Sequence, residues 1–271
     1  MGYSLLSRDQ ILALTHPWKG ERFPDGRPRV PDDIIRRMKL VTTEEAWGVL
    51  RREGYNFQFS GNWMNLHPEQ TLVGRAVTCV FMPQRPDVQA AVVETGQAEG
   101  RIGGQNSWVI DTLVENDCIV VDLFGKIKNG TFAGDNLGTS IHAKTKTGMV
   151  IDGGIRDTQR IFDIENFPVF VRGLDPTAIA DVTLMGINVP IRIDEATCLP
   201  GDVVLGTRTG LTFIPPHLAD QVVVRSEDIR QRDQFGHQRL REGKYTPGEI
   251  DRKWSDEIDA DFAQWKKERE V

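Results

Sequence analysis

The stretch 148-GMVIDGGIRDTQRI-161, with 134-GDNLGTSIHAK-144 before it, decides how this sequence can fold. Residues 149–151 form a short apolar run that is typical of a buried strand. The run leads into an aspartate, two glycines and then Arg156 and Asp157. A plain turn could use Asp-Gly or Gly-Gly to reverse the chain, but it would not need an arginine and an aspartate directly afterwards. The pair therefore indicates that chemistry is placed at the end of a strand.

The preceding stretch, 134–144, predicts a tight loop that leads into a helix. Gly134 opens the loop, and Leu137 and Ile141 are spaced four residues apart, as on one face of a helix. Backbone N–H groups at the start of a helix lie at the positive end of its dipole and can bind a carboxylate or an enolate oxygen. An ordinary helix N-cap without a ligand is the alternative interpretation of this loop.

The two stretches together predict a βαβ-like unit with a polar crevice. A helix over 136–147 would return the chain to the strand at 148–152, and ligands of such units lie at the carboxyl ends of the strands. Arg156 is suited to a carboxylate or a developing oxyanion. Asp157, with Asp135 across the crevice, is suited to a hard divalent cation that keeps several waters. A surface Arg–Asp pair of little consequence is the alternative.

The rest of the chain predicts an α/β fold with a mostly β second half around one core. Apolar runs that indicate strands lie at 72–82, 118–123, 148–152, 168–172, 187–193, 202–206 and 211–214. The helices expected between the earlier strands cover 87–101 and 136–147.

Both ends of the sequence extend beyond this core. Residues 1–40 form an arm rich in proline, glycine and charge, with a short helix expected behind Pro31. The pattern from Thr42 to Glu45 is a capping box that begins a helix ending at Gly54.

The tail is predicted to be helical. A second capping box runs from Thr246 to Glu249, with Pro247 at the favoured first position. Large apolar side chains then recur at helical spacing, namely Ile250, Trp254, Ile258, Phe262 and Trp265. Such a stripe must lie against apolar surface, so we expect core packing or a subunit contact and not a cofactor site.

Composition excludes several classes of function. Of the 271 residues, 39% are hydrophobic and 27% charged, and the net charge of −6 does not fit a general nucleic-acid binder. No apolar run approaches the ~20 residues that cross a bilayer, and the first residues lack a secretory pattern, so we expect a cytoplasmic protein without a membrane partner. Cys79, Cys118 and Cys198 lie far apart in apolar contexts and are expected to be buried free thiols.

Other catalytic motifs are missing from the sequence. It contains no GxGxxG, P-loop, GxSxG or HExxH pattern, and its five histidines lack metal-ligand spacing. Lys144 and Lys146 lie in a polar, alternating segment where solvated side chains are expected. This context disfavours an aldolase that forms a Schiff base with lysine.

Several segments resemble the family that contains RraA proteins and the metal-dependent 4-hydroxy-4-methyl-2-oxoglutarate/4-carboxy-4-hydroxy-2-oxoadipate aldolases. They are VTTEEAWGVL, TLVGRAVTC, GDNL…GMVIDGGIRD, FPVFVRG, INVPI and PGDVVLGTRTGLTFIP. The resemblance implies a compact α/β/β catalytic domain over 41–243, flanked by the arm at 1–40 and a helical extension at 244–271. It also implies a homotrimer or hexamer with sites between the subunits.

The resemblance assigns a role to each residue of the two loops. Asp157 would be the direct ligand of Mg²⁺ or Mn²⁺, and Asp135 would hold a metal-bound water. Arg156 would bind the 2-oxo oxygen and stabilise the enolate. The amides of Asn136 and Leu137, in the loop that Gly134 opens, would bind the carboxylate of the 2-oxo acid.

One further acidic residue of the family lies near the C-terminus and reaches the site of a neighbouring subunit. It precedes a Leu-x-x-Gly ending, which 239-RLREG-243 matches here. Asp233 is the nearest acidic match, where the aldolases use glutamate. The resemblance therefore implies that Asp233 takes part in catalysis.

The sequence thus predicts a divalent-metal-dependent lyase that cleaves a 4-hydroxy-2-oxo acid through a pyruvate-type enolate. Oxaloacetate decarboxylation would follow from the same stabilisation of an enolate. Two alternatives remain open. One is a non-catalytic RraA-type regulator that binds RNase E. The other is a sugar-acid dehydratase or hydratase that uses the same site with a different leaving group.

Overall fold

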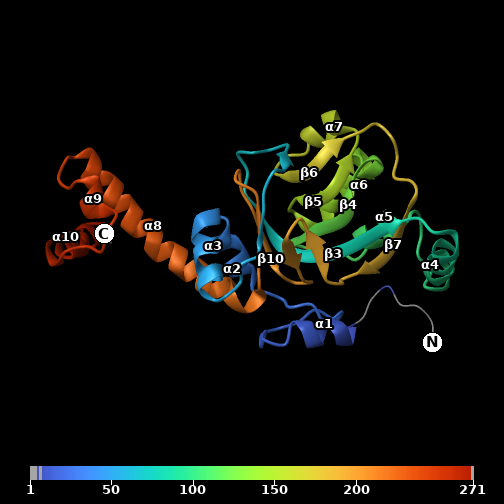
Figure 1. The fold of residues 1–271 in the computed structure, drawn as a ribbon, viewed down its shortest axis with the longest axis horizontal. Helices are drawn as coiled ribbons and strands as arrows, with labels where there is room; N and C mark the ends of the chain where they lie inside the picture. Colours follow the sequence, from blue (N-terminus) through green and yellow to red (C-terminus); the bar gives the residue numbers. More distant parts are fainter. Residues whose placement is uncertain (1–4, 6–7, 270–271) are drawn as a thin grey trace. The chain divides into compact units, whose positions relative to one another are not determined.

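The computed structural model describes residue 5 and residues 8–269, and its strands follow the predicted order. The strands are β1 (Phe59–Ser60), β2 (Met64–Asn65), β3 (Leu72–Pro83), β4 (Asp117–Ala133), β5 (Met149–Ile155), β6 (Val169–Leu174), β7 (Val182–Ile187), β8 (Ile191–Ile193), β9 (Ala196–Cys198), β10 (Val203–Gly206) and β11 (Leu211–Ile214). Within the described residues, nine of them form one sheet in the order β1-β11-β10-β3-β4-β5-β6-β2, with β7 also paired to β3. Strands β8 and β9 form a separate hairpin. Figure 1 shows the neighbouring strands β3, β4, β5 and β6 of the large sheet.

The helices include those predicted in the first half of the chain, together with others that were not predicted. They are α1 (Arg8–Leu14), α2 (Asp32–Met38), α3 (Thr43–Arg52), α4 (Pro86–Ala98), α5 (Gln105–Ile110), α6 (Asp135–Thr145), α7 (Thr158–Phe162), α8 (Ala219–Arg241), α9 (Pro247–Ile250) and α10 (Asp256–Lys267), with a 3₁₀ turn at Pro216–Leu218. The capping box from Thr42 to Glu45 is present and begins α3. The α/β class is therefore confirmed.

The centre of the sheet is parallel, which explains its sequence. Strands β3, β4, β5 and β6 run parallel to one another, while β7 and β10 run antiparallel to β3. Alternate side chains of these strands enter two different cores, so the strands read as continuous apolar runs. Along β4, for example, Ile119 and Val121 belong to one core, and Cys118 and Val120 to the other.

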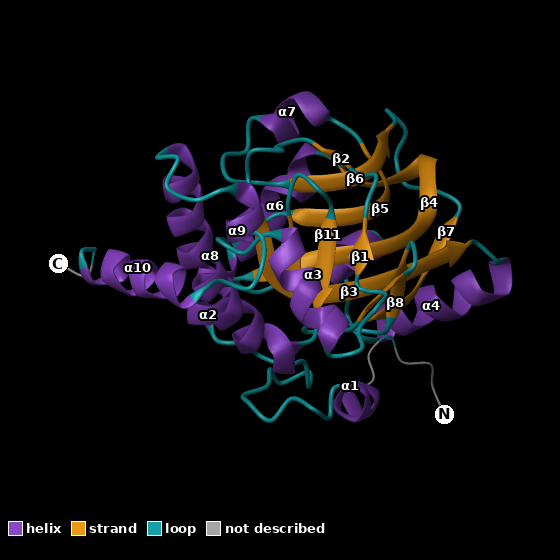
Figure 2. Ribbon diagram, turned by 60° about the vertical axis from the view of Figure 1, so that its left-hand side comes forward, coloured by secondary structure: helices purple, strands orange, loops and turns teal. Residues whose placement is uncertain are grey.

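The two cores of the sheet contain side chains from different kinds of element, and Figure 2 distinguishes the helices and strands by colour. One core contains helical side chains, including Trp108 of α5, Ile141 of α6 and Ile161 of α7. The other contains the β8–β9 hairpin. The three cysteines are free and buried, as predicted.

Several predicted boundaries were wrong, and the strand expected over 118–123, for example, spans Asp117–Ala133. The strand expected to end at residue 152 continues to Ile155, because its two glycines allow close pairing with β4 and β6. Asp152 is therefore inside the strand, where its carboxylate accepts a hydrogen bond from Arg172 Nε at 2.6 Å. The strand expected over 187–193 is broken after Ile187, because Asn188 has a φ of 53° and Pro190 follows it.

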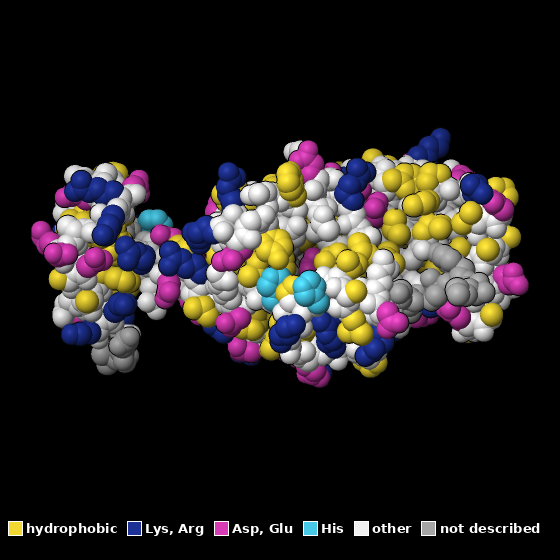
Figure 3. All heavy atoms as spheres, turned by 60° about the horizontal axis from the view of Figure 1, so that its bottom comes forward, with side chains coloured by type: hydrophobic (Ala, Val, Ile, Leu, Met, Phe, Trp, Pro, Cys, Tyr) yellow, Lys and Arg dark blue, Asp and Glu magenta, His cyan; other side chains and the backbone are white. Residues whose placement is uncertain are grey.

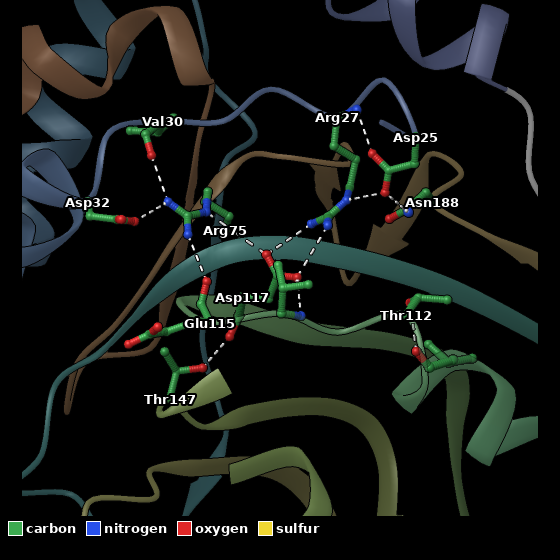
Figure 4. A network of polar contacts seen from close by, with 12 residues as sticks. Asp25, Arg27, Val30, Asp32, Arg75, Thr112, Glu115, Asp117, Thr147 and Asn188 are labelled. Atoms are coloured by element: carbon green, nitrogen blue, oxygen red, sulfur yellow. Dashed lines mark hydrogen bonds and ion pairs between the residues drawn. The ribbon is translucent and has the colours of Figure 1, made fainter. Parts of the chain in front are cut away.

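The N-terminal arm is attached to the sheet through buried arginines (Figure 4). Arg27 donates to both oxygens of Asp117, at 3.0 and 3.2 Å, and its Nε donates to Asp25 at 2.8 Å. Arg75 of β3 donates to the Val30 carbonyl and to Asp32, both at 2.7 Å. These contacts fix both ends of the arm segment from Asp25 to Asp32.

A second compact unit comprises residues 223–271. Its core surrounds Phe235 of α8, whose ring lies 5.3 Å from those of Trp254 and Phe262 and 5.8 Å from that of Trp265. The apolar stripe of the tail is therefore core packing within this unit, as expected. The helix is not continuous, however, because Ser255 starts a new N-cap by accepting from the backbone N–H of Ile258. The predicted domain boundary at 243 stays a prediction.

Candidate functional site

The candidate site lies where three parallel strands end. Ala133 of β4 pairs with Ile155 of β5, which in turn pairs with Leu174 of β6. The Arg156 backbone N–H donates to the Ala133 carbonyl at 3.1 Å, which extends the pairing by one residue. The loops that leave β4 and β5 are therefore next to each other at the carboxyl edge of the sheet, as the βαβ pattern predicted.

Gly134 allows these two loops to make close contact. It is the N-cap of α6, and a Cβ atom placed on it would lie 2.3 Å from Asp157 Oδ2 and 3.3 Å from Arg156 Nε. Such a distance is far below van der Waals contact, so a side chain at this position would displace the Asp157 carboxylate. Gly134 thus allows the close approach of the Arg156–Asp157 pair.

Asp157 has an unusual backbone conformation that directs its carboxylate to this contact. Its φ is 55° and its ψ is 34°, in the left-handed region, and it is the N-cap of α7. Aspartate visits this region more readily than most residues, and such outliers cluster at functional sites. The left-handed turn at Asp157 places its carboxylate beside Gly134 and 3.5 Å from Arg156 Nε.

Arg156 is the most available cation of the site. Its side chain is 43% exposed, and that of Asp157 is 41% exposed. Within the described residues, the Arg156 guanidinium has no hydrogen-bond acceptor and only this loose ion pair. Its Nη donors are therefore free to bind an external oxyanion.

Asp135 is held by a cation that the sequence analysis missed. Arg160 Nη1 lies 2.9 Å from Asp135 Oδ2, and the backbone N–H of Asn136 donates to Asp135 Oδ1 at 2.9 Å. The hydrogen bond from Arg160, followed by that from Asn136, keeps the pKa of Asp135 below its ordinary value. Asp135 therefore remains a carboxylate at neutral and mildly acidic pH.

The Asn136 contact changes one detail of the predicted site. Its amide was expected to bind the substrate carboxylate, whereas here it donates to Asp135. The N–H groups of the first turn of a helix have no carbonyl partner inside the helix. Leu137, in the first turn of α6, thus remains suited to bind an anion.

A small cavity of about 90 Å³ brings the predicted residues together. Its lining includes Gly134, Asp135, Asn136, Leu137, Arg156 and Asp157, together with Asn106, Thr131, Phe132, Ala178 and Ile179. Asn106 was missed, because a single asparagine in a glycine-rich segment gives no periodic or motif signal. Arg160 could have been noticed, because it follows Asp157 by one helical turn in α7.

Asp233 lies in the second compact unit, on α8, where its side chain is exposed. Its part in catalysis stays a prediction.

The carboxylates of the cavity fit a hard divalent cation. Within the described residues, there is no cluster of three or more His, Cys, Asp or Glu side chains that could hold a metal ion. Asp135 and Asp157 nevertheless line one cavity. Mg²⁺ is commonly held by only one or two carboxylates, with waters and substrate oxygens as the other ligands.

Comparison with known proteins places this arrangement in a family. A family model described as RraA-like (Aldolase/RraA) matches residues 43–212. The chain belongs to the RraA-like family. This confirms the resemblance seen in the sequence, and the matched range contains both loops of the site.

Relatives that match by sequence include the following two proteins. An uncharacterized protein of Methanocaldococcus jannaschii is 29% identical over 145 residues, which are 51% of this chain and 69% of that protein. A protein of Halalkalibacterium halodurans named "Putative 4-hydroxy-4-methyl-2-oxoglutarate aldolase" is 32% identical over 134 residues. That match spans 48% of this chain and 63% of the relative, less than two thirds of its length.

Two solved structures share the RraA-like fold. An uncharacterized protein from Pseudomonas syringae superposes with a TM-score of 0.66 at 22% identity, covering 82% of this chain and 98% of that one. Streptomyces coelicolor RraAS2, described as an unusual member of the RNase ES inhibitor RraA protein family, gives 0.64 at 24% identity, covering 78% and 98%. At these identities the likeness concerns the fold.

The surface and the helices bear on possible partners. In the described part of the chain, no helix combines the length and apolar character that a membrane crossing requires. On the face seen in Figure 3, basic and acidic side chains are interspersed among the described residues.

Proposed function

We propose that this RraA-like protein is a divalent-metal-dependent lyase that cleaves a 4-hydroxy-2-oxo acid to pyruvate and a carbonyl compound. One observation carries the proposal. The exposed guanidinium of Arg156, without a hydrogen-bond acceptor among the described residues, lies in one small cavity with two carboxylates and the start of α6. The name of the Halalkalibacterium relative agrees with it.

Each residue of the cavity has a role in this proposal. The 2-oxo acid's carboxylate binds at the N-terminal turn of α6, near the Leu137 amide. Arg156 donates to the 2-oxo oxygen and binds it more tightly as negative charge accumulates there. Asp157 and Asp135 would hold Mg²⁺ or Mn²⁺, which supplies Lewis acidity next to the 2-oxo group when it is bound.

The proposed reaction cleaves one carbon–carbon bond of the substrate. The C4 hydroxyl loses its proton, the C3–C4 bond breaks, and its electron pair forms the enolate of pyruvate. The C4 fragment leaves as an aldehyde or ketone, and the enolate takes a proton at C3. Asp135 is ionised and can orient a water that accepts the hydroxyl proton. With oxaloacetate, carbon dioxide would leave instead.

A neighbouring copy of the chain is part of the proposal. Phe124, Ile127 and Leu174 are large apolar side chains that are 37–44% exposed. Ile127 lies over Gly173, directly before Leu174, so this apolar surface adjoins the site. We propose that it is covered in a homotrimer or hexamer, in which Asp233 of one copy serves the site of another. Light scattering coupled to size-exclusion chromatography tests the assembly, and a monomer would contradict it.

Pyruvate release tests the activity directly. Purified protein with Mg²⁺ or Mn²⁺ should release pyruvate from 4-hydroxy-4-methyl-2-oxoglutarate or a related acid, and carbon dioxide from oxaloacetate. EDTA should abolish both reactions, and added metal should restore them. Full turnover by protein shown to be metal-free would contradict the proposal. A product with the substrate's intact carbon skeleton would indicate a dehydratase, and RNase E binding without turnover would indicate a regulator.

A further inference from the structure

A second cavity, of about 440 Å³, adjoins the small site cavity. The two share Asn106 and Ile179 in their linings, so they meet at the start of α5. The site cavity, at about 90 Å³, is far below the roughly 300–1,000 Å³ of common small-molecule pockets, whereas the second cavity falls within that range. A 2-oxo acid held at Arg156 must therefore extend out of the site cavity beyond its reacting carbons.

Carboxamide side chains form much of the second cavity. They come from Gln84, from Gln89 and Gln97 of α4, and from Gln105 and Asn106 of α5. The Gln89 Oε1 atom accepts from Gln105 Nε2 at 3.1 Å and from Thr183 Oγ1 at 2.7 Å. These bonds fix the orientation of the Gln89 amide, so its Nε2 remains as a donor.

Two other carboxamides of the cavity lining still have donors and acceptors that a ligand can use. Within the described residues, no side-chain hydrogen bond involves Gln84 or Gln97. Each carboxamide provides both donors and an acceptor. A ligand group that both donates and accepts, as a hydroxyl does, therefore matches this lining.

The arginine of the lining is already paired. Arg101 Nε lies 2.6 Å from Glu99 Oε2, and its Nη1 donates to the Trp108 carbonyl at 3.4 Å. Asp181 is an acidic member of the same lining. An anionic ligand group would therefore meet an arginine that is already paired and an aspartate that repels it.

The wall of the cavity is also firmly packed. A Cβ atom on Gly96 of α4 would lie 2.2 Å from the Trp108 ring, so the ring presses directly against the helix backbone. Trp108 is buried, and it belongs to the same core as Phe81 and Val182 of the cavity lining. Helix α4 is therefore held against the core at the point where its glutamines face the cavity.

A third cavity, of about 570 Å³, shares Arg156 and Asp157 with the site cavity and differs in character from the second. Arg156, Asp157, Arg160 and Asp175 line it, so charged side chains dominate there. A charged end of a ligand would be better matched by this third cavity than by the carboxamide wall.

We propose that the glutamine-rich cavity binds the substrate beyond C4, and that this part is an uncharged, hydroxylated carbon chain. The proposal rests on the lyase function proposed above and gives it a substrate class, the 3-deoxy-2-oxo sugar acids. Cleavage of the C3–C4 bond would then release pyruvate and a hydroxylated aldehyde. The C4 hydroxyl proton leaves, and the bond's electron pair becomes the enolate.

Three tryptophan variants test this assignment. Gln97→Trp fills the glutamine-rich cavity, and Gln159→Trp fills the charged third cavity. Glu94→Trp places the same bulk on an exposed position of α4 that lines none of the three cavities described above. The substrates are 3-deoxy-2-oxogluconate, which has an uncharged trihydroxylated chain, 4-hydroxy-4-methyl-2-oxoglutarate, which ends in a carboxylate, and oxaloacetate. Circular dichroism verifies that each variant is folded.

The expected result is specific to one variant and one substrate. Gln97→Trp should raise the KM for 3-deoxy-2-oxogluconate about tenfold or more, because hydrogen bonds to the chain are lost. Oxaloacetate decarboxylation should be unchanged in this variant, because oxaloacetate does not reach the cavity. Glu94→Trp and Gln159→Trp should leave the KM for 3-deoxy-2-oxogluconate unchanged. Wild-type protein should have a higher kcat/KM for this acid than for the dicarboxylate.

Other outcomes would overturn the assignment. An unchanged KM in Gln97→Trp, or an increase in Gln159→Trp instead, would place the chain elsewhere. A preference for the dicarboxylate would contradict the uncharged class while leaving the lyase function intact. If wild-type protein neither decarboxylates oxaloacetate nor binds pyruvate in calorimetry with Mg²⁺ present, the proposed function itself fails, and this inference fails with it.

Discussion

Two groups of arginine and aspartate residues in this protein use the same chemistry for different ends. Arg27 and Asp117 are 2% and 0% exposed, and their bidentate pairing is completed by other donors and acceptors. Arg156 and Asp157 are 43% and 41% exposed and 3.5 Å apart, and the Arg156 guanidinium has no hydrogen bond among the described residues. Burial and the full use of hydrogen-bonding groups thus distinguish an attachment point from a binding site.

The difference follows from the energetics of charge. A buried charge is stable only when its hydrogen-bonding capacity is used within the protein, so the Arg27–Asp117 pair has none to offer a ligand. Removal from water raises the pKa of the Asp117 carboxyl, and the Arg27 guanidinium opposes that shift. An exposed pair contributes little to stability but can exchange its water for a ligand. Four predictions test this contrast, from the largest expected effect to the smallest.

Removing the buried carboxylate should destabilise the protein most. We expect Asp117→Ala to lower the free energy of unfolding by about 3–5 kcal/mol, because Arg27 is left buried without its partner. Urea unfolding followed by circular dichroism measures the effect. The double variant Arg27→Met/Asp117→Leu should recover much of the loss. A loss below about 1 kcal/mol in Asp117→Ala would contradict the structural role.

Removing the exposed guanidinium should affect activity and not stability. Arg156→Ala is expected to lower kcat/KM for pyruvate release about 10²–10³-fold, as for loss of one donor to a developing oxyanion. Its urea midpoint should match that of the wild type. Arg85→Ala breaks another exposed Arg–Asp pair, the one with Asp87, and serves as the control with unchanged activity. Similar losses in both variants would remove the distinction between the site and an ordinary surface pair.

Asp202, which has no cationic partner among the described residues, should make the stability of the protein depend on pH. Asp202 is fully buried, and burial raises its pKa to about 8. The folded state therefore binds a proton that the unfolded state releases near pH 4, so stability should fall as pH rises from about 4 to 8. In Asp202→Asn, this contribution to the dependence of stability on pH should vanish. Melting temperatures of both proteins, measured across this pH range, test the prediction. If the melting temperature depends on pH equally in both proteins, Asp202 is not protonated in the folded state.

The smallest effect is expected at the exposed pair of Arg160 and Asp135. Arg160→Gln should leave the urea midpoint unchanged, because Arg160 is 80% exposed. The pKa of Asp135 should rise toward its ordinary value, because the guanidinium that lowers it is gone. Carboxyl ¹³C NMR titration measures that pKa. An unaltered value would show that the contact does not persist in solution.

Much of the site was predictable because its residues are close in sequence. Two loops on either side of one helix meet at a sheet edge in any right-handed βαβ unit, so Asp135 and Arg156 could be paired from the sequence alone. Asn106 was missed because it bears no motif, whereas Arg160 could have been noticed from its spacing to Asp157. The interrupted strand after Ile187 was missed because its apolar pattern continues through Asn188 and Pro190.

The sequence by itself determined the parallel α/β core, the two capping boxes, and the pairing of the segment at Gly134 with Arg156 and Asp157. These depend on short-range patterns of polarity, glycine and proline. Only the tertiary structure decided which Arg–Asp pair is buried and which is free, since burial depends on segments far apart in the chain. Arg27 and Asp117 are separated by 90 residues, and no local pattern predicts that they meet. The left-handed turn of Asp157 against Gly134 is likewise a product of the assembled sheet edge.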